Sequence, residues 1–146
     1  MAAINRIFNP LSRNWAIDLG LFLLRAGTGV LLVPHGIMKV NSFSEKADGF
    51  YNFMHLGGRV SMGLTIFAEV VCSILLVLGL FTRLTLIPLI ITMIVAVFVI
   101  NPNATLGDRE SGLLYLVPYV VLFFTGPGRI SMDQMLFGRK QTVAKV

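Results

Sequence analysis

Two charged residues lie deep within apolar stretches of this sequence. Arg25 falls in the run of residues 17–38, and Glu69 falls in the run of residues 60–81. A charge at the centre of a bilayer costs roughly 2.5–3.5 kcal/mol on insertion scales, so such residues are rare without a partner. At a helical rise of about 1.5 Å per residue, each charge lies about 14–15 Å into its run, near the middle of a hydrocarbon layer. We therefore predict an Arg25–Glu69 ion pair, with Asp18 as a competing partner for Arg25.

The predicted pair has two interpretations. It fixes the register of two helices, or it forms a polar site that orients a ligand head group or relays a proton. A second titratable cluster contains His35 and Lys39, at the end of the first run, and residues 108–110. Histidine changes charge near neutral pH, so His35 could accept a proton or donate a hydrogen bond to a quinone carbonyl. Alternatively, His35 has a structural role and forms a hydrogen bond with a backbone group that Pro34 leaves unpaired.

The composition is that of a membrane protein. The 146 residues are 55% hydrophobic and 13% charged, and the mean hydropathy is +0.81, whereas soluble domains have about 25% charged residues. The net charge of +5 comes from basic residues that flank apolar runs. This placement is typical of membrane-flanking charges and excludes a nucleic-acid interface. The single cysteine, Cys72, cannot form a disulfide within the chain, so the chain alone performs no dithiol chemistry.

We predict one all-α domain over residues 1–146, an integral membrane four-helix bundle with spans at about 15–38, 60–81, 84–100 and 111–126. A short amphipathic helix is expected between the first and second spans, begun by a capping box at Ser42 and Glu45. Seven lysines and arginines flank one side and four flank the other. This bias predicts that both termini, including the tail 127–146, are cytoplasmic.

Each predicted span has one polar face, which we expect to turn inward. Four residues on these faces are predicted to be catalytic: Arg25, His35, Glu69 and Glu110. Four more are predicted to bind a ligand: Lys39, Thr65, Ser73 and Tyr115. No spacing typical of metal ligands occurs in the sequence, and one histidine lies in a connection, so neither a metal site nor a bis-histidine haem is predicted.

Three segments resemble the DoxX family of small bacterial membrane proteins. They are Leu24-Arg25 leading to His35-Gly36-x-x-Lys39, then Phe67-Ala68-Glu69 through Gly79–Arg83, and finally Thr125–Asp133. Arg25, His35, Lys39, Glu69, Arg83 and residues 126–133 match the family pattern. Glu110 fits the acidic position that opens the family's fourth helix, whereas Asp108-Arg109 departs from its glycine-rich lead-in.

The resemblance implies a four-helix protein of the bacterial inner membrane. One relative is the small subunit of a thiosulfate:quinone oxidoreductase, and another works in a membrane complex linked to thiol stress and superoxide. Many members are labelled oxidoreductases without a known substrate. Distant relatives act as cargo receptors or assembly chaperones.

Two function hypotheses from different classes follow. The first is a membrane subunit of a quinone-linked redox system, which binds quinone or a small reductant among its inward polar residues. In this hypothesis the chain has no intrinsic cofactor, so its electrons come from a partner redox protein or a soluble reductant. The expected assembly is a complex with that partner or a homo-oligomer, and the sequence does not decide whether the chain is itself an enzyme. The alternative is a non-enzymatic scaffold, assembly factor or chaperone subunit. A small-molecule transporter is least favoured, because one four-helix unit offers little room for alternating access.

Overall fold

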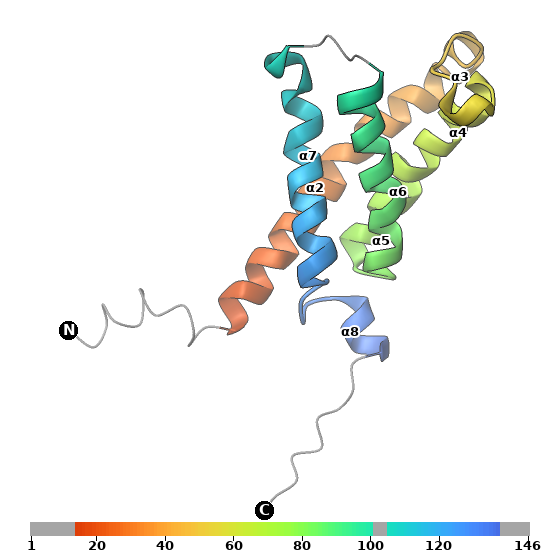
Figure 1. Cartoon of the computed structure of the whole chain (residues 1–146). Helices are drawn as coiled ribbons and strands as arrows, with labels where there is room; N and C mark the ends of the chain where they lie inside the picture. Colours follow the sequence, from red (N-terminus) through yellow and green to blue (C-terminus); the bar gives the residue numbers. More distant parts are fainter. Residues whose placement is uncertain (1–13, 101–104, 138–146) are drawn as a thin grey trace, which may run out of the picture.

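The computed structural model describes residues 14–100 and 105–137, apart from the side chains of Asn14 and Asp108 (Figure 1). Several basic residues that predict the orientation lie outside the described residues: Arg6, Arg13, Arg139, Lys140 and Lys145. Every regular element in the described part of the chain is helical, which confirms the all-α prediction.

A long first helix is followed by a short irregular connection. The helix is α2 (Asn14–Asn41), and the connection contains α3 (Phe43–Lys46) and η2 (Phe53–His55). The predicted amphipathic helix is therefore much shorter than its pattern suggests. Ser42 does not cap it, because its hydroxyl donates a hydrogen bond to the Met38 carbonyl at 3.0 Å.

The next two helices form an antiparallel hairpin. The first arm is the continuous run of α4 (Gly58–Ile66), the π-helical η3 (Phe67–Cys72) and α5 (Ser73–Leu78). The second arm is α6 (Thr82–Ile94) with the π-helical η4 (Val95–Val99). They are followed by α7 (Leu106–Thr125) and by the short α8 (Met132–Phe137). Figure 1 shows α3 and α8 at opposite ends of the molecule, which we call the α3 end and the α8 end.

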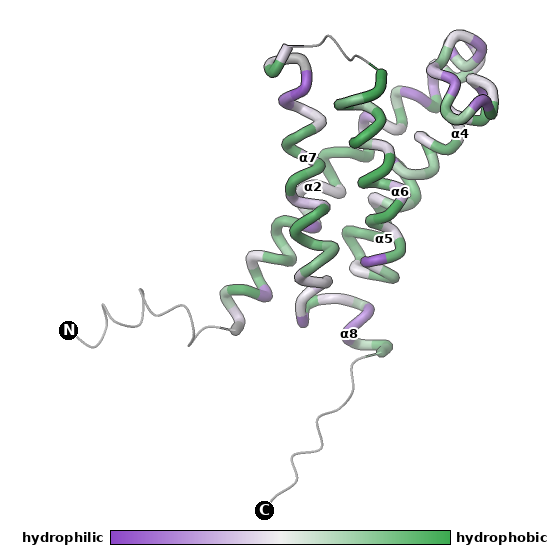
Figure 2. Tube along the Cα trace, viewed as in Figure 1, coloured by the Kyte–Doolittle hydropathy of each residue, from purple (hydrophilic) through white to green (hydrophobic). Residues whose placement is uncertain are grey.

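Among the residues that the structure describes, three helices are long and apolar enough to cross a membrane: Trp15–Asn41, Gly58–Leu78 and Thr82–Val99. The helix α7 is also 20 residues long, but its first turns contain Asp108, Arg109 and Glu110. Figure 2 shows hydrophobic residues along most of each long helix and hydrophilic ones mainly toward the two ends. Many apolar side chains on the outer faces are exposed, as expected for a surface in contact with lipid tails.

Glycines allow α2 to pack closely on the first arm of the hairpin. A Cβ atom at Gly29 would lie 2.9 Å from the Ser73 carbonyl oxygen, and one at Gly36 would lie 3.0 Å from the Glu69 Cβ atom. Small residues at helix contacts let two backbones approach closely, and such contacts are common in membranes. The two glycines therefore set how α2 lies against η3 and α5.

The segment after α7 closes the α8 end of the molecule. Asp133 accepts hydrogen bonds from the backbone N–H groups of Phe81 at 2.6 Å and Thr82 at 2.8 Å. Its own N–H donates to the Gly79 carbonyl at 2.8 Å. Because the first N–H groups of a helix have no partner within it, Asp133 caps α6 from a distant part of the chain. The tail segment is thereby fastened to the tip of the hairpin.

We expect Asp133→Ala to lower the free energy of unfolding by about 1–2 kcal/mol, because it leaves the first N–H groups of α6 unpaired. Thermal unfolding of the purified protein in detergent measures the effect. Asp48→Ala is the matched control. Asp48 forms an ion pair with Arg59 at 2.6 Å in which both side chains are exposed, and exposed pairs contribute little. Equal losses in the two variants would contradict the capping role.

Candidate functional site

The buried carboxylate Glu69 is paired with Lys39. The Lys39 Nζ atom lies 2.7 Å from Oε1 and 2.5 Å from Oε2 of Glu69. The Glu69 side chain is 5% exposed, whereas that of Lys39 is 29% exposed. The pair therefore joins the last turn of α2 to the middle of the first hairpin arm, and only its lysine has access to the surface.

The predicted Arg25–Glu69 pair is wrong, and the direction of helical side chains explains why. Side chains on a helix lean toward its N-terminus. Since α2 runs antiparallel to the first hairpin arm, Arg25 leans toward the α8 end and Glu69 leans toward the α3 end. Lys39 leans back from the α3 end toward the middle of the molecule, so it meets Glu69.

A π-helical turn carries Glu69. The turn spans Phe67–Cys72, and Ala68, Glu69 and Cys72 are its buried residues. Such turns insert an extra residue into an α-helix and occur frequently at functional sites. Here the wider turn faces the close approach of Gly36, which is three residues before Lys39 in α2. The turn and the glycine together bring the carboxylate within reach of the lysine.

A cavity of about 460 Å³ lies beside the pair. Its wall contains Lys39 from α2, three aromatic residues from the α3–η2 connection, and residues of both hairpin arms. Those residues are Phe50, Tyr51, Phe53, Ser61, Leu64, Thr65, Phe67, Glu69, Pro88, Ile91, Thr92, Val95, Ala96 and Ile100. Leu64, Phe67, Ile91 and Ile100 are each about half exposed, so the cavity opens on the outer, apolar surface between the two arms. The wall is apolar except for the ion pair and a few hydroxyl groups.

Strained backbone holds the aromatic part of the cavity wall. Met54 and His55 have φ angles of 51° and 60°, a region that residues other than glycine rarely adopt. The Phe53 N–H donates to the Ser61 hydroxyl at 3.0 Å, and the Gly57 N–H donates to the Asn52 side chain at 2.7 Å. The hydrogen bond from Arg59 also holds the pKa of the Asp48 carboxyl below its usual value. These contacts tie the α3–η2 connection to the start of α4.

Two tyrosines of α7 lie near Glu69 but do not line the cavity. Tyr115 and Tyr119 both interact electrostatically with the Glu69 carboxylate, and their rings are stacked with centroids 6.2 Å apart. Tyr119 is 0% exposed, and its hydroxyl makes no hydrogen bond to another described residue. The predicted ligand-binding set names Tyr115, which does not line the cavity, and does not name its neighbour Tyr119. The four-residue spacing of the two tyrosines on one apolar helix is the signal that could have found it.

Arg25 lies away from the cavity, at the α8 end. It is 1% exposed, and it donates hydrogen bonds to the carbonyls of Pro127 at 3.3 Å and Ile130 at 2.7 Å. Gly79 has a φ of 69° and leaves no room for a Cβ atom beside the guanidinium. The alternative partner, Asp18, instead accepts a hydrogen bond from the Arg129 N–H at 2.9 Å. Arg25 thus holds the segment before α8 against α2.

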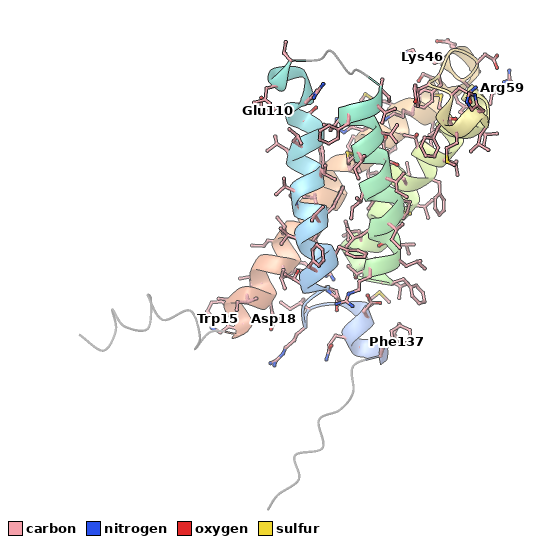
Figure 3. All side chains as sticks on the ribbon, viewed as in Figure 1. Trp15, Asp18, Lys46, Arg59, Glu110 and Phe137 are labelled. Carbon is pink, nitrogen blue, oxygen red and sulfur yellow. The ribbon has the colours of Figure 1, made fainter. Side chains whose placement is uncertain are left out.

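The other predicted site residues are dispersed. Thr65 lines the cavity. His35 is exposed, its Nδ1 atom lies 3.2 Å from the Leu31 carbonyl, and its ring packs edge-on against Tyr115. Ser73 is fully buried near Gly29. Glu110 is exposed on the side of α7 away from α6 (Figure 3), where it borders a separate recess. No group of residues that could hold a metal ion occurs in the described part of the chain.

The fold and the comparisons with known proteins define the class. Residues 20–102 match the model of the DoxX family, and the chain belongs to this family of membrane proteins. It is 33% identical over 136 residues to "Uncharacterized membrane protein Rv3486" of Mycobacterium tuberculosis, with 80% of each chain covered. It is 27% identical over 131 residues to "Putative oxidoreductase CatD" of Bacillus subtilis, with 88% of this chain and 95% of that protein covered. No solved structure gives a significant match.

We expect Arg25→Met to lower the free energy of unfolding by about 2–4 kcal/mol, because the carbonyls of Pro127 and Ile130 lose a charged donor. Arg25→Lys should recover only part of this loss, since one ammonium group does not reproduce the fork of the guanidinium. Ligand binding in the cavity should be unchanged in whichever variant folds. A variant that keeps wild-type stability but loses binding would instead place Arg25 in the site.

We expect the two halves of the Lys39–Glu69 pair to respond unequally. Lys39→Met leaves a buried carboxylate without its cation and should cost about 3–5 kcal/mol. Glu69→Gln should cost clearly less, because the partly exposed lysine can turn toward water. Thermal unfolding of both variants at one pH gives the comparison. Equal losses of unfolding free energy, or a larger loss for Glu69→Gln, would contradict the explanation that the unequal burial of the two side chains determines their contributions.

Proposed function

We propose that this protein is a membrane subunit of a quinone-linked redox system and that a quinone head group binds in the cavity beside Lys39 and Glu69. The observation that carries the proposal is the composition of that cavity. An apolar pocket with a few convergent polar groups is the usual form of a small-molecule site. Its opening faces the lipid-exposed surface, from which a quinone would enter.

The chemistry of the wall suits a quinone. Reduction of a quinone to a quinol takes up two electrons and two protons, and its carbonyl oxygens accept hydrogen bonds in the oxidised form. Lys39 can donate to a carbonyl oxygen, and Glu69 can exchange a proton with it, since both line the same cavity. Phe50, Tyr51 and Phe53 offer ring faces against which a planar head group can pack. The electrons would come from a partner redox protein or a soluble reductant.

The similarity to "Putative oxidoreductase CatD" supports a redox context. A second candidate function is a non-enzymatic scaffold or assembly subunit. It is favoured by one observation: Lys39 already satisfies both oxygens of Glu69. In this second function the pair would act purely as a structural link between α2 and η3.

For the topology, we propose that α7 is a fourth span of a bacterial inner-membrane protein with both termini in the cytoplasm. The helix α7 packs against α6 and α2. It starts at the α3 end, and the chain after it is fastened at the α8 end by Arg25 and Asp133. A helix that joins the two ends in this way would cross the same layer as its neighbours, which supports a fourth span.

We expect Ala96→Trp to fill the cavity and to weaken binding of a short-tailed ubiquinone analogue about tenfold or more, a loss equivalent to about 1.4 kcal/mol. Titration of the detergent-purified full chain measures the affinity. Leu114→Trp is the control, because Leu114 is 65% exposed and borders the recess on α7. Unchanged binding in Ala96→Trp would exclude this cavity, and absence of binding to the wild-type chain would favour the scaffold.

A further inference from the structure

The Tyr119 hydroxyl is a buried polar group for which the described residues offer no hydrogen-bond partner. Tyr119 is 0% exposed and belongs to the same buried cluster as Ala68 and Cys72, which flank Glu69 on η3. Buried polar groups are nearly always paired, so an unpaired one in a native structure requires an explanation. Tyr119 interacts electrostatically with the Glu69 carboxylate, and its ring stacks on Tyr115, which in turn packs against His35 beside the Gly36–Glu69 contact. Lys39, however, occupies both oxygens of that carboxylate.

The two residues of the ion pair differ in their freedom to move. Glu69 is held in the buried turn of η3, whereas Lys39 has a flexible stem, is 29% exposed and lies in the last turn of α2. Both line the cavity. An electron-rich oxygen in the cavity could therefore draw Lys39 away from Glu69. Glu69 would then need another donor, because an uncompensated buried carboxylate is unfavourable.

We propose that Tyr119 is the reserve partner of Glu69 in an exchange of partners that makes the cavity selective for anionic, lipophilic ligands. When a ligand oxyanion binds Lys39, the Tyr119 O–H donates a hydrogen bond to the Glu69 carboxylate. No bond other than hydrogen bonds and ion pairs is broken or formed in this exchange. The class of ligand is an ionised ring hydroxyl on an apolar body, such as a quinol anion. The choice of a quinone-like ligand rests on the proposed function, whereas the exchange itself does not.

The exchange is tested first without a ligand, by a double-mutant cycle on thermal unfolding. Tyr119→Phe alone should not lower the free energy of unfolding, because the hydroxyl that it removes makes no hydrogen bond in the paired state. Combined with Lys39→Met, it should lower the free energy of unfolding by clearly more than the sum of the two single changes.

Thr82→Val is the matched control, because Thr82 is 0% exposed and its hydroxyl is likewise unpaired among the described residues, but at the α8 end. It should be additive with Lys39→Met. Additivity of Tyr119→Phe with Lys39→Met would overturn the proposal.

The second test uses a pair of probes and also decides the matter if Lys39→Met does not fold. An alkylated 2-hydroxy-1,4-naphthoquinone is anionic at neutral pH, and its 2-methoxy ether is neutral. The wild-type chain should bind the anion more tightly, and Tyr119→Phe should reduce that affinity about tenfold, the effect of one hydrogen bond to a charged group. The affinity for the ether should not change, and Thr82→Val should change neither.

The outcomes separate the two proposals. Retention of the full preference for the anion in Tyr119→Phe would overturn the exchange while leaving quinone binding in place. Failure of both probes to bind the wild-type chain would instead remove the proposed quinone site. The double-mutant cycle would then decide the exchange alone, and coupling between Lys39 and Tyr119 would support it.

Discussion

A charge inside an apolar molecule must be matched by a partner in contact with it, and the arrangement of this protein depends on how that requirement is met. Glu69 is matched by Lys39, and Arg25 by two backbone carbonyls of the segment before α8. The first match ties α2 to η3 near the α3 end. The second ties α2 to the chain after α7 at the α8 end. Each buried charge thus holds a different pair of segments, and neither needs the other.

Irregular backbone makes the first match possible. The π-helical turn around Glu69 changes the register between α4 and α5, and a side chain at position 36 would keep α2 away from η3. The cavity borders the same carboxylate, and the strained connection around Met54 supplies aromatic residues to its wall. The ion pair, the π-helical turn and the cavity are therefore parts of one site. A ligand in the cavity would contact the Glu69 carboxylate while Lys39 is already paired with it.

The helices were predictable from sequence because long apolar runs have few alternatives. The two buried charges, Arg25 and Glu69, were also predictable from their position in those runs. Their partners were not, because Arg25 and Lys39 lie on the same face of one helix, and only the lean of the side chains in antiparallel neighbours decides between them. The carbonyl partners of Arg25 could not be foreseen, since they belong to a segment without regular structure. Tyr119 was not among the predicted site residues because a tyrosine within an apolar helix is ordinarily a core residue.

Native mass spectrometry of the protein extracted gently from its own membrane tests the central claim, a lipophilic ligand site beside Lys39 and Glu69, most directly. The account predicts a quinone or quinol that stays bound to the wild-type chain and is lost when Ala96 is replaced by tryptophan. A wild-type chain that carries only phospholipid, or that is bound only to a protein partner, would contradict the account and favour a scaffold.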